Sequence, residues 1–227
     1  MVSLLIINPN SSESVTQGLQ ETLVPPPGTQ LHFYTAPPEG PPAINDVTTG
    51  VASAQACAVD IVHKGLINQY DGFLVCCFSD HALTHVLREK TTKPVVGILE
   101  SAVAHALFVG QRFGIITTGT GYKYIHYAEV RNFLGATSDR FAGLVTTGLG
   151  VVELREGDQK RIEAKVKESS AKIAEQGADV ILLGCAGMAG MEGLVKKGVE
   201  EAGLPPVRVI DGAKAGVEFL AGLARLG

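Results

Sequence analysis

The sequence predicts an α/β protein with two similar lobes, each containing a parallel, roughly four-stranded sheet flanked by helices. We expect a pseudo-twofold axis to relate the lobes and the functional site to lie between them. Two observations lead to this fold class. Short, almost continuously apolar runs alternate with longer amphipathic segments along the 227 residues, as in a parallel sheet covered on both faces. In addition, the run that opens at Asp71 matches the run that opens at Asp179, and a cysteine stands six residues after each.

The expected strands are short apolar runs that end near polar residues or glycine. They span residues 3–7, 31–35, 72–76, 94–98, 113–118, 141–145, 179–184 and 207–210. The expected helices are the longer amphipathic segments between them. They span residues 11–24, 47–68, 81–90, 101–109, 122–134, 158–176, 191–202 and 213–226. Asn10, with Glu13 three residues later, can cap the first helix. The proline-rich stretch at residues 36–43 is a candidate flap.

Matching segments recur in the same order in the two halves of the chain. Residues 5–8 match 114–118, residues 71–77 match 179–185, and residues 94–100 match 206–211. The matches include polar as well as apolar positions, which favours a true repeat of the fold. We therefore place the first lobe at residues 1–99, joined by the C-terminal segment 208–227, and the second lobe at residues 100–207.

The composition excludes several classes of partner. A formal net charge of −4 argues against nucleic acid, whose binding needs a basic face. Aromatic residues make up only 6% of the chain, which argues against base-stacking platforms. No apolar run is long enough to span a membrane, and the N-terminus lacks the basic region of a signal peptide. We therefore expect a cytoplasmic protein whose partner is neither nucleic acid nor membrane.

No cofactor is expected either. The glycine-rich segments complete neither a dinucleotide-binding fingerprint nor a phosphate-binding loop. His81 and His85 stand four residues apart, but no third ligand accompanies them at metal-binding spacing. Four cysteines in a chain of this length do not form a disulfide framework, so free thiols are expected.

Cys77 and Cys185 are the candidate catalytic residues. Both stand at the C-terminal ends of matched strands, where open α/β sheets bind their ligands. Each also precedes a predicted helix, whose N-terminal peptide groups favour a thiolate. Cys57 lies on a helix rich in alanine and valine, and Cys76 should face away from Cys77 because strand residues alternate. We expect both of these to fill the core.

Two thiols on opposite sides of a small molecule suit proton transfer at a carbon atom. One thiolate removes a proton from one face, and the other thiol delivers a proton to the opposite face, so that a stereocentre is inverted. A developing enolate also needs hydrogen-bond donors. The backbone N–H groups after the two cysteines, those of Phe78, Ser79, Ala186 and Gly187, are the candidates.

Several segments resemble signature motifs of the aspartate/glutamate/hydantoin racemase superfamily, in particular those of its hydantoin and allantoin racemases of fungal type. They are Asn8-Pro-Asn-Ser-Ser12, Cys77-Phe-Ser-Asp80, Gly97-Ile-Leu-Glu100, Phe113-Gly-Ile-Ile-Thr-Thr118, Leu183-Gly-Cys-Ala-Gly-Met188 and Val209-Ile-Asp-Gly212. The resemblance covers nearly the whole chain. It implies a cofactor-independent racemase of 5-substituted hydantoins, such as allantoin, with Cys77 and Cys185 as the two bases, and it implies a homo-oligomer.

The motifs and the flap together predict the surroundings of the two thiols. We expect substrate contacts from Asn8, Ile44, Phe78, Ser79, Thr117, Thr118, Ala186 and Gly187. Asp80, Glu100 and Asp211 either orient the residues that contact the substrate or simply cap helices. Ser79 and His81 depart from the Gly and Pro that are common in the resembling motif, so they leave the choice of substrate open.

Other functions use the same two thiols. A cysteine-dependent isomerase could act on a small dicarboxylate by covalent addition, but it needs cationic anchors, and few arginines or lysines stand near the predicted strand ends. A decarboxylase of a disubstituted malonate needs only one thiol. A racemase relative that binds a nitrogen metabolite and regulates a partner without turnover is the third alternative. The sequence leaves open the ring substituent, the cysteine that serves each enantiomer and the subunit number.

Overall fold

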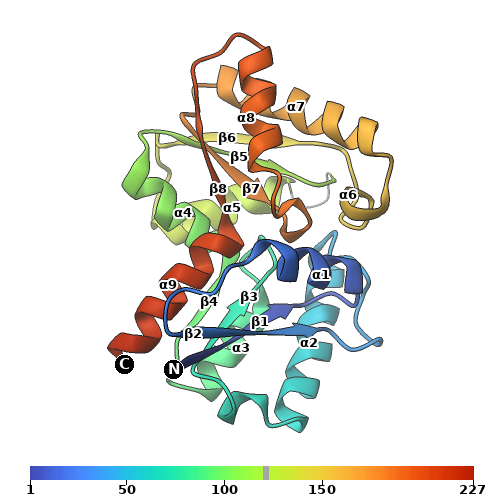
Figure 1. The fold of residues 1–227 in the computed structure, drawn as a ribbon, viewed down its shortest axis with the longest axis vertical. Helices are drawn as coiled ribbons and strands as arrows, with labels where there is room; N and C mark the ends of the chain where they lie inside the picture. The colour runs from blue at the N-terminus through green and yellow to red at the C-terminus, as the bar shows by residue number, and fades with distance from the viewer. Residues whose placement is uncertain (120–122) are drawn as a thin grey trace.

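The computed structural model describes residues 1–119 and 123–227, and it contains two parallel sheets with the same strand order (Figure 1). The first sheet has the order β2-β1-β3-β4 and the second the order β6-β5-β7-β8. The strands are β1 (Val2–Asn8), β2 (Thr29–Thr35), β3 (Gly72–Val75), β4 (Val95–Gly97), β5 (Phe113–Thr117), β6 (Phe141–Thr146), β7 (Val180–Gly184) and β8 (Arg208–Asp211). The predicted fold class, two lobes with parallel four-stranded sheets, is confirmed.

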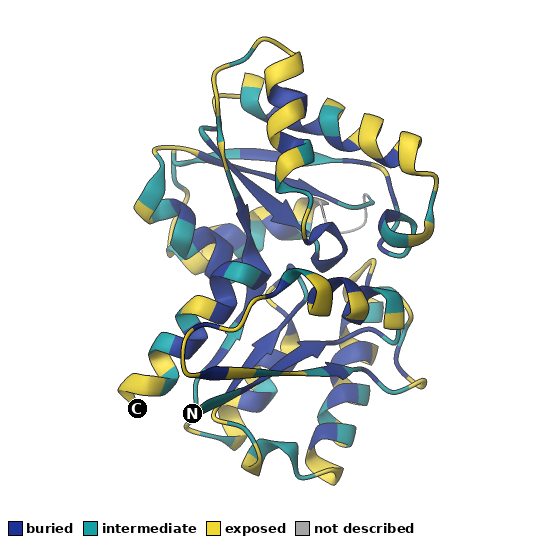
Figure 2. Cartoon of the chain, in the orientation of Figure 1, coloured by how far each residue is buried: buried dark blue, intermediate teal, exposed yellow. Residues whose placement is uncertain are grey.

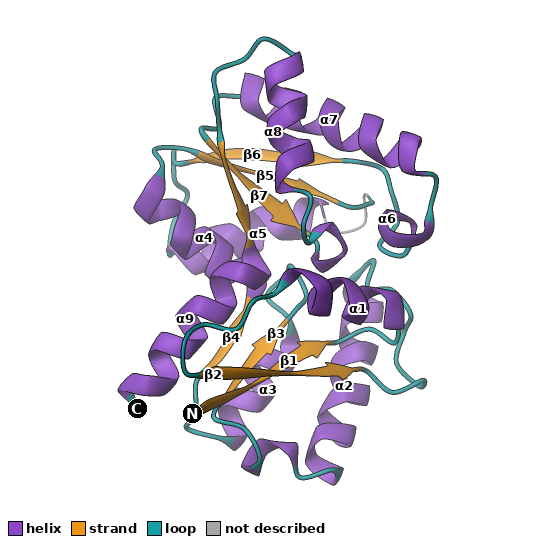
Figure 3. Cartoon of the chain, viewed as in Figure 1, coloured by secondary structure: helices purple, strands orange, loops and turns teal. Residues whose placement is uncertain are grey.

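Helices cover both sheets (Figure 3). They are α1 (Glu13–Thr22), α2 (Val47–His63), α3 (Ala82–Lys90), α4 (Ile98–Val109), α5 (Lys123–Leu134), α6 (Glu153–Glu156), α7 (Gln159–Glu175), α8 (Glu192–Glu201) and α9 (Gly212–Leu226), with 3-10 turns η1 (Leu66–Asn68) and η2 (Ala186–Met188). Tyr122, the first residue of one predicted helix, lies outside the described residues. The short helix α6 was not predicted from the sequence. The helix α2 ends five residues before its predicted end at residue 68, because Gly65 takes a left-handed conformation (φ +62°) that stops a helix.

The start of the first helix also differs from the prediction. Asn10 does not cap α1, which begins after Ser12. Instead the Asn10 side chain accepts a hydrogen bond from the Ser12 amide at 3.0 Å. Such a local turn competes with helix capping, and it keeps the Asn10 side chain beside the end of β1.

The chain crosses between the lobes directly after the last strand of each sheet. The two helices that follow, α4 after β4 and α9 after β8, pack mainly against each other. Among the strands, α4 contacts β7 of the second sheet most and α9 contacts β3 of the first most. A Cβ atom at Gly212 would collide with the Ile98 carbonyl, so glycine allows the two crossing helices to begin side by side. The predicted division gave residues 208–227 to the first lobe. The structure differs over 208–211, because β8 is hydrogen-bonded to β7 in the second sheet.

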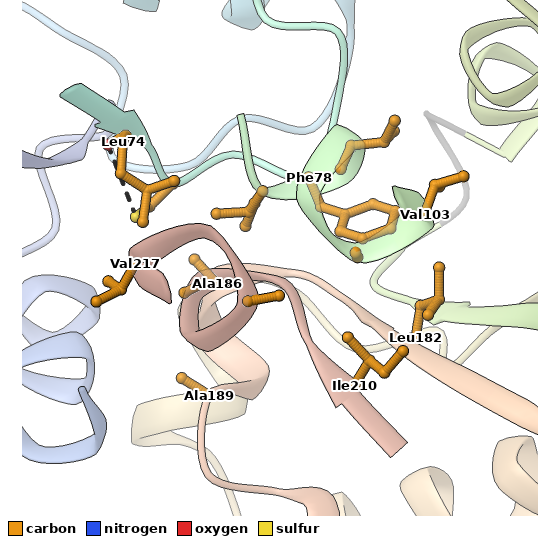
Figure 4. Close-up of a cluster of buried hydrophobic side chains, with 14 of the residues drawn as sticks. Leu74, Phe78, Val103, Leu182, Ala186, Ala189, Ile210 and Val217 are labelled. Atoms are coloured by element: carbon orange, nitrogen blue, oxygen red, sulfur yellow. Dashed lines mark hydrogen bonds between the residues drawn. The ribbon is translucent and has the colours of Figure 1, made fainter. Parts of the chain in front are cut away.

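One hydrophobic core is shared by the two lobes. Leu74 of β3, Val103 of α4, Leu182 of β7, Ile210 of β8 and Val217 of α9 belong to the same cluster (Figure 4). Two further clusters lie within the single lobes, and the central strands β1, β3, β5 and β7 are buried almost throughout (Figure 2). A shared core fixes the lobes relative to each other, because close-packed interiors deform little.

The expected core cysteines are in the core. Cys76 is 2% exposed and lies in the shared cluster, and Cys57 is fully buried in the first lobe. Burial raises the pKa of Cys57 to about 12, so it is an uncharged thiol at neutral pH. None of the helices in the described part of the chain combines the length and apolar character that a membrane crossing requires.

Candidate active site

A cavity of about 370 Å³ lies where the carboxyl ends of β3, β5 and β7 face one another. Its volume is at the lower end of the ~300–1,000 Å³ that is usual for small-molecule sites. Its described lining comes from both lobes and consists of Asn10, Ile44, Asn45, Asp46, Cys76, Cys77, Phe78, Thr117, Thr118, Gly119, His126, Val151, Gly184, Cys185 and Ala186. The two candidate catalytic cysteines therefore share one cavity.

Cys77 reaches the cavity because β3 ends just before it. The Cys76 amide still donates to the Ile7 carbonyl at 2.8 Å, which turns the Cys76 side chain into the core and leaves Cys77 on the other side. The Ser79 hydroxyl donates a hydrogen bond to the Cys77 sulfur at 3.2 Å. Burial raises the pKa of Cys77 to about 12, the Ser79 hydrogen bond opposes this, and the charges of Cys185 and Glu129 add to it.

Cys185 stands at the start of η2, directly after β7. The Gly187 amide donates to its sulfur at 3.3 Å. Burial raises the pKa of Cys185, whereas hydrogen bonds from the Gly187 amide and the Thr118 hydroxyl, followed by the positive charge of Arg155, lower it. Cys185 therefore has more groups that stabilise its thiolate than Cys77 has.

The helix-based prediction of two stabilised thiolates is only partly correct. An amide of η2 does contact Cys185, but α3 begins at Ala82, five residues after Cys77. For both cysteines, the loss of hydration upon burial raises the pKa more than the nearby hydrogen-bond donors lower it, because a buried anion is costly.

Close packing at the end of β7 sets the position of Cys185. A Cβ atom on Gly184 would lie 2.7 Å from the Ile116 carbonyl oxygen and 2.8 Å from the Thr117 Cβ. Glycine thus lets β7 approach β5 closely, and the Thr117 hydroxyl donates to the Gly184 carbonyl. This contact fixes Thr117 and Cys185 next to each other on the cavity wall.

Five of the predicted substrate contacts line the cavity: Ile44, Phe78, Thr117, Thr118 and Ala186. The amides of Phe78 and Ala186 make no hydrogen bond to another residue of the described chain. By contrast, the Ser79 amide is bound to the Cys77 carbonyl and the Gly187 amide to the Cys185 sulfur. Of the four predicted backbone donors, those of Phe78 and Ala186 are therefore available to a ligand.

Three predicted substrate contacts do not line the cavity but support residues that do. Ser79 and Gly187 contact the two sulfurs, as described above, and do not line the cavity. Asn8 is fully buried, and its amide nitrogen donates to the Asn10 side chain, the Ser12 carbonyl and the Thr16 hydroxyl. Asn8 thus holds the loop that brings Asn10 to the cavity, and Asn10 is one of the polar lining residues, with Asn45, Asp46 and His126, that the sequence did not single out.

The three acidic residues that were predicted to orient the site or cap helices form hydrogen bonds close to their own positions in the chain. The Glu100 carboxylate accepts the Gly97 amide hydrogen at the start of α4, and Asp211 accepts the Ala213 amide hydrogen at the start of α9. Both are therefore helix caps. Asp80 is exposed, and its carboxylate pairs with His85 at 2.6 Å.

His81 is buried beside the Cys77 loop and does not line the cavity. Its Nδ1 atom accepts the Leu83 amide hydrogen, and its Nε2 atom lies 3.3 Å from the Ser53 hydroxyl, which donates to the Pro9 carbonyl. Burial lowers the pKa of His81 to about 4, so the ring is neutral at pH 7. Neither Ser79 nor His81, the two departures from the resembling motif, faces the cavity.

His126 lines the cavity and was missed by the sequence analysis. It is 2% exposed on α5, and its Nδ1 atom lies 2.7 Å from Glu129. The only signal in the sequence was the spacing of a histidine and a glutamate three residues apart on one helix, which places them on one face. Within the described part of the chain no group of His, Cys, Asp or Glu is arranged to hold a metal ion.

The chain is similar to several known proteins over almost its whole length. The family model described as Asp/Glu/Hydantoin racemase matches residues 4–220. A hydantoin racemase of Pseudomonas sp. (strain NS671) is 31% identical over all of this chain and 87% of its own length. An uncharacterized Schizosaccharomyces pombe protein is 38% identical over all of this chain and 93% of its own length. The structure of allantoin racemase from Klebsiella pneumoniae superposes with a TM-score of 0.85 at 28% identity, covering all of this chain and 89% of that one.

Proposed function

The chain belongs to the Asp/Glu/hydantoin racemase family, and on this premise we propose that it is a cofactor-independent racemase of 5-substituted hydantoins, allantoin or a related ring. The observation that carries the proposal is the placement of Cys77 and Cys185 on one cavity at equivalent strand ends. The names of its relatives, hydantoin racemase and allantoin racemase, support this substrate class. The described lining also offers mainly amide, hydroxyl and thiol groups, which suit an uncharged ring.

The proposed reaction needs one thiolate and one thiol. The thiolate takes the proton from C5, and the electron pair of the C–H bond moves into the adjacent carbonyl to form an enolate. The opposite thiol then delivers its proton to the other face of C5, so that the product leaves the first sulfur protonated and the second ionised. Mutual repulsion favours the singly ionised state, because a charge on Cys185 raises the pKa of Cys77.

The burial of the thiols and the amides beside them both favour this chemistry. A thiolate whose pKa is raised to about 12 is rare at neutral pH, but it is a stronger base toward a carbon acid once it has formed. The free amides of Phe78 and Ala186 can hydrogen-bond to the enolate oxygen, and such preorganised donors each contribute about 10²–10³-fold in rate. Each amide directly follows one of the two cysteines, so donors and bases are positioned together.

The test is racemisation of enantiopure hydantoins, followed by circular dichroism, with allantoin and several 5-alkyl and 5-aryl hydantoins as substrates. We expect wild-type turnover of at least one of them. Cys77→Ser and Cys185→Ser should each lose about 10³-fold or more, because a serine hydroxyl is a far weaker acid than a thiol. Cys57→Ala, in the core of the first lobe, is the matched control and should retain activity.

Two results would overturn the proposal. If wild-type protein racemises none of these hydantoins but does racemise glutamate or aspartate, the substrate class is wrong. If both serine variants racemise at the wild-type rate, the two-thiol mechanism is wrong, whatever the substrate.

A further inference from the structure

The side-chain amide of Asn10 is held in one orientation beside the end of β1. Its Oδ1 atom accepts the Ser12 amide hydrogen at 3.0 Å and a second hydrogen bond from Asn8 Nδ2 at 3.1 Å. A backbone N–H can only donate, so the Asn10 atom that faces Ser12 must be the oxygen. The Asn8 side chain is fixed in the same way, because its own oxygen accepts the Asn10 amide hydrogen. These contacts engage the oxygen of the Asn10 side chain and leave its NH₂ group.

The NH₂ group of Asn10 donates to no residue of the described chain and is open to the cavity. Asn10 is only 5% exposed, and it lines the cavity together with the two catalytic cysteines. Within the described residues, the side-chain atoms that are sealed off without a partner belong to Thr84, Arg155 and Asp211, so the Asn10 nitrogen is not sealed off. Because buried polar groups are almost always hydrogen-bonded, this donor calls for an acceptor oxygen on the molecule that fills the cavity.

The matching strand end of the second lobe has no such donor. There the Thr117 hydroxyl donates to the Gly184 carbonyl, and the Thr118 hydroxyl donates to the Cys185 sulfur. Both β1 and β5 occupy the second position of their sheets. The polar side chains after β5 are thus engaged within the protein, whereas Asn10 after β1 keeps a donor for a ligand.

We propose that Asn10 is a substrate-positioning residue, whose NH₂ group donates a hydrogen bond to the C2 carbonyl oxygen of a hydantoin ring. The inference rests on the proposed function and extends it from the reacting carbon to the distant carbonyl of the ring. The amides of Phe78 and Ala186 serve the C4 carbonyl, whose oxygen becomes the enolate oxygen beside C5. The C2 carbonyl is the acceptor that remains, and N1 separates it from C5, so a donor at C2 orients the ring without touching the reacting bond.

The position of this hydrogen bond determines how it enters the reaction. The C2 oxygen gains little charge when the enolate forms at C4, so the bond holds the substrate and the transition state about equally well. An interaction of this kind lowers KM and leaves kcat nearly unchanged. A donor to the enolate oxygen would instead raise kcat.

Asn10→Asp tests the NH₂ group alone. A carboxylate keeps an oxygen for Ser12 and Asn8, and aspartate forms the same local turn as asparagine. The experiment compares a 5-substituted hydantoin with its 2-thio analogue, in which sulfur, a weaker acceptor, replaces the C2 oxygen. The measured quantity is kcat/KM for the oxo compound divided by kcat/KM for the thio compound. The different C5 acidity of the thio ring affects every variant alike, so it cancels when this ratio is compared between proteins.

We expect this ratio to be about 10-fold larger for wild type than for Asn10→Asp, the usual cost of losing a buried hydrogen bond, and the difference to lie in KM. Asn10→Ala removes the donor without adding a charge and should show the same loss of discrimination. Asn45→Asp places a similar charge on the cavity wall at an exposed residue and is the matched control. It should keep the wild-type ratio, which a role of Asn10 in the fold alone would not distinguish from the other two.

The outcomes separate this inference from the proposed function. If Asn10→Asp and Asn10→Ala, folded as judged by circular dichroism, keep the wild-type ratio, Asn10 does not bind the C2 oxygen, although wild-type racemisation still supports the proposed function. An equal loss of discrimination in Asn45→Asp would assign the effect to charge and would also overturn the role of Asn10. A wild-type protein that racemises no hydantoin overturns the proposed function itself.

Discussion

The two cysteine sites share a backbone plan and differ in their chemistry. Each cysteine follows the third strand of an equally ordered parallel sheet. Cys77 is followed by Phe-Ser-Asp-His and receives one hydrogen bond, from a serine hydroxyl. Cys185 is followed by Ala-Gly-Met-Ala, and it is stabilised as a thiolate by a backbone amide, a threonine hydroxyl and the charge of Arg155.

The charged groups near the two sulfurs differ as well. Glu129 lies close enough to raise the pKa of Cys77, whereas Arg155 lowers that of Cys185. When one of the two thiols ionises, the charge should therefore reside mainly on Cys185. Two equivalent strand ends can thus carry thiols of unequal acidity, because the loops that follow them differ.

Acid should destabilise the protein through the loop of Cys77, where the largest effect is expected. Burial lowers the pKa of His81 from 6.5 to about 4, and Ala189 occupies the matched position after Cys185. Between these pH values the unfolded state binds the proton and the folded state does not. The neutral ring's contribution to the free energy of unfolding is therefore complete above pH 6.5 and is lost as the pH falls toward 4. Its maximum is on the order of 3 kcal/mol.

Urea unfolding at pH 7.5 and pH 4.5 measures this contribution. His81→Asn keeps a side-chain acceptor for the Leu83 amide but cannot be protonated, so it should lose less stability on acidification than wild type. Equal losses in the two proteins would show that His81 is not the responsible group.

Alkylation should distinguish the two thiols. Iodoacetamide reacts with thiolates, and hydrogen bonds and the charge of Arg155 lower the pKa of Cys185, whereas only the Ser79 hydrogen bond lowers that of Cys77. At pH 8.5 we expect Cys185 to be modified before Cys77, as followed by peptide mass spectrometry, with buried Cys57 and Cys76 as internal references. Faster modification of Cys77 contradicts the assignment of the charge.

Arg155 should account for part of the advantage of Cys185. Its guanidinium packs on Gly18 of α1 and donates to the Ala189 carbonyl at the end of η2. Arg155→Met should slow alkylation of Cys185 about 3- to 10-fold, because the thiolate loses a nearby cation, and should leave Cys77 unchanged. In Arg155→Lys, which keeps the charge, the rate of Cys185 alkylation should lie between those of wild type and Arg155→Met. An equal effect on both thiols would point to a general loss of structure.

The smallest expected effect concerns Ser79. Ser79→Ala removes the hydroxyl that donates to the Cys77 sulfur, so the pKa of Cys77 should rise further and its alkylation should slow by about 3-fold. The rate at Cys185 serves as the reference within the same sample. No change at Cys77 would mean that the hydroxyl does not stabilise its thiolate.

Sequence patterns could predict the parts of this site that lie on strands. The apolar runs and the matched cysteines fix where β3 and β7 end, and thereby place Cys77 and Cys185. They could not separate Asn8 from Asn10, because both are polar residues at the end of β1 and only packing decides which one lines the cavity. His126 was missed because its position depends on how α5 of one lobe meets the Cys77 loop of the other. The crossing of α4 and α9 likewise depends on contacts between residues distant in sequence, such as Ile98 and Gly212.

Enantiomers have equal free energies, so kcat/KM must be the same in both directions for wild type and for every variant. Racemisation rates therefore cannot show which thiol acts on which enantiomer, whereas isotope exchange can. A variant that keeps one cysteine can still remove and return a proton on one face of C5 without inverting it.

The most direct measurement follows deuterium incorporation at C5 in D₂O, with each enantiomer of the best hydantoin substrate and with Cys77→Ser and Cys185→Ser. The two-thiol account predicts exchange with retention, for one enantiomer with Cys77→Ser and for the opposite enantiomer with Cys185→Ser. If both variants exchange the same enantiomer, or if either inverts its substrate at the wild-type rate, Cys77 and Cys185 do not serve opposite faces of the substrate.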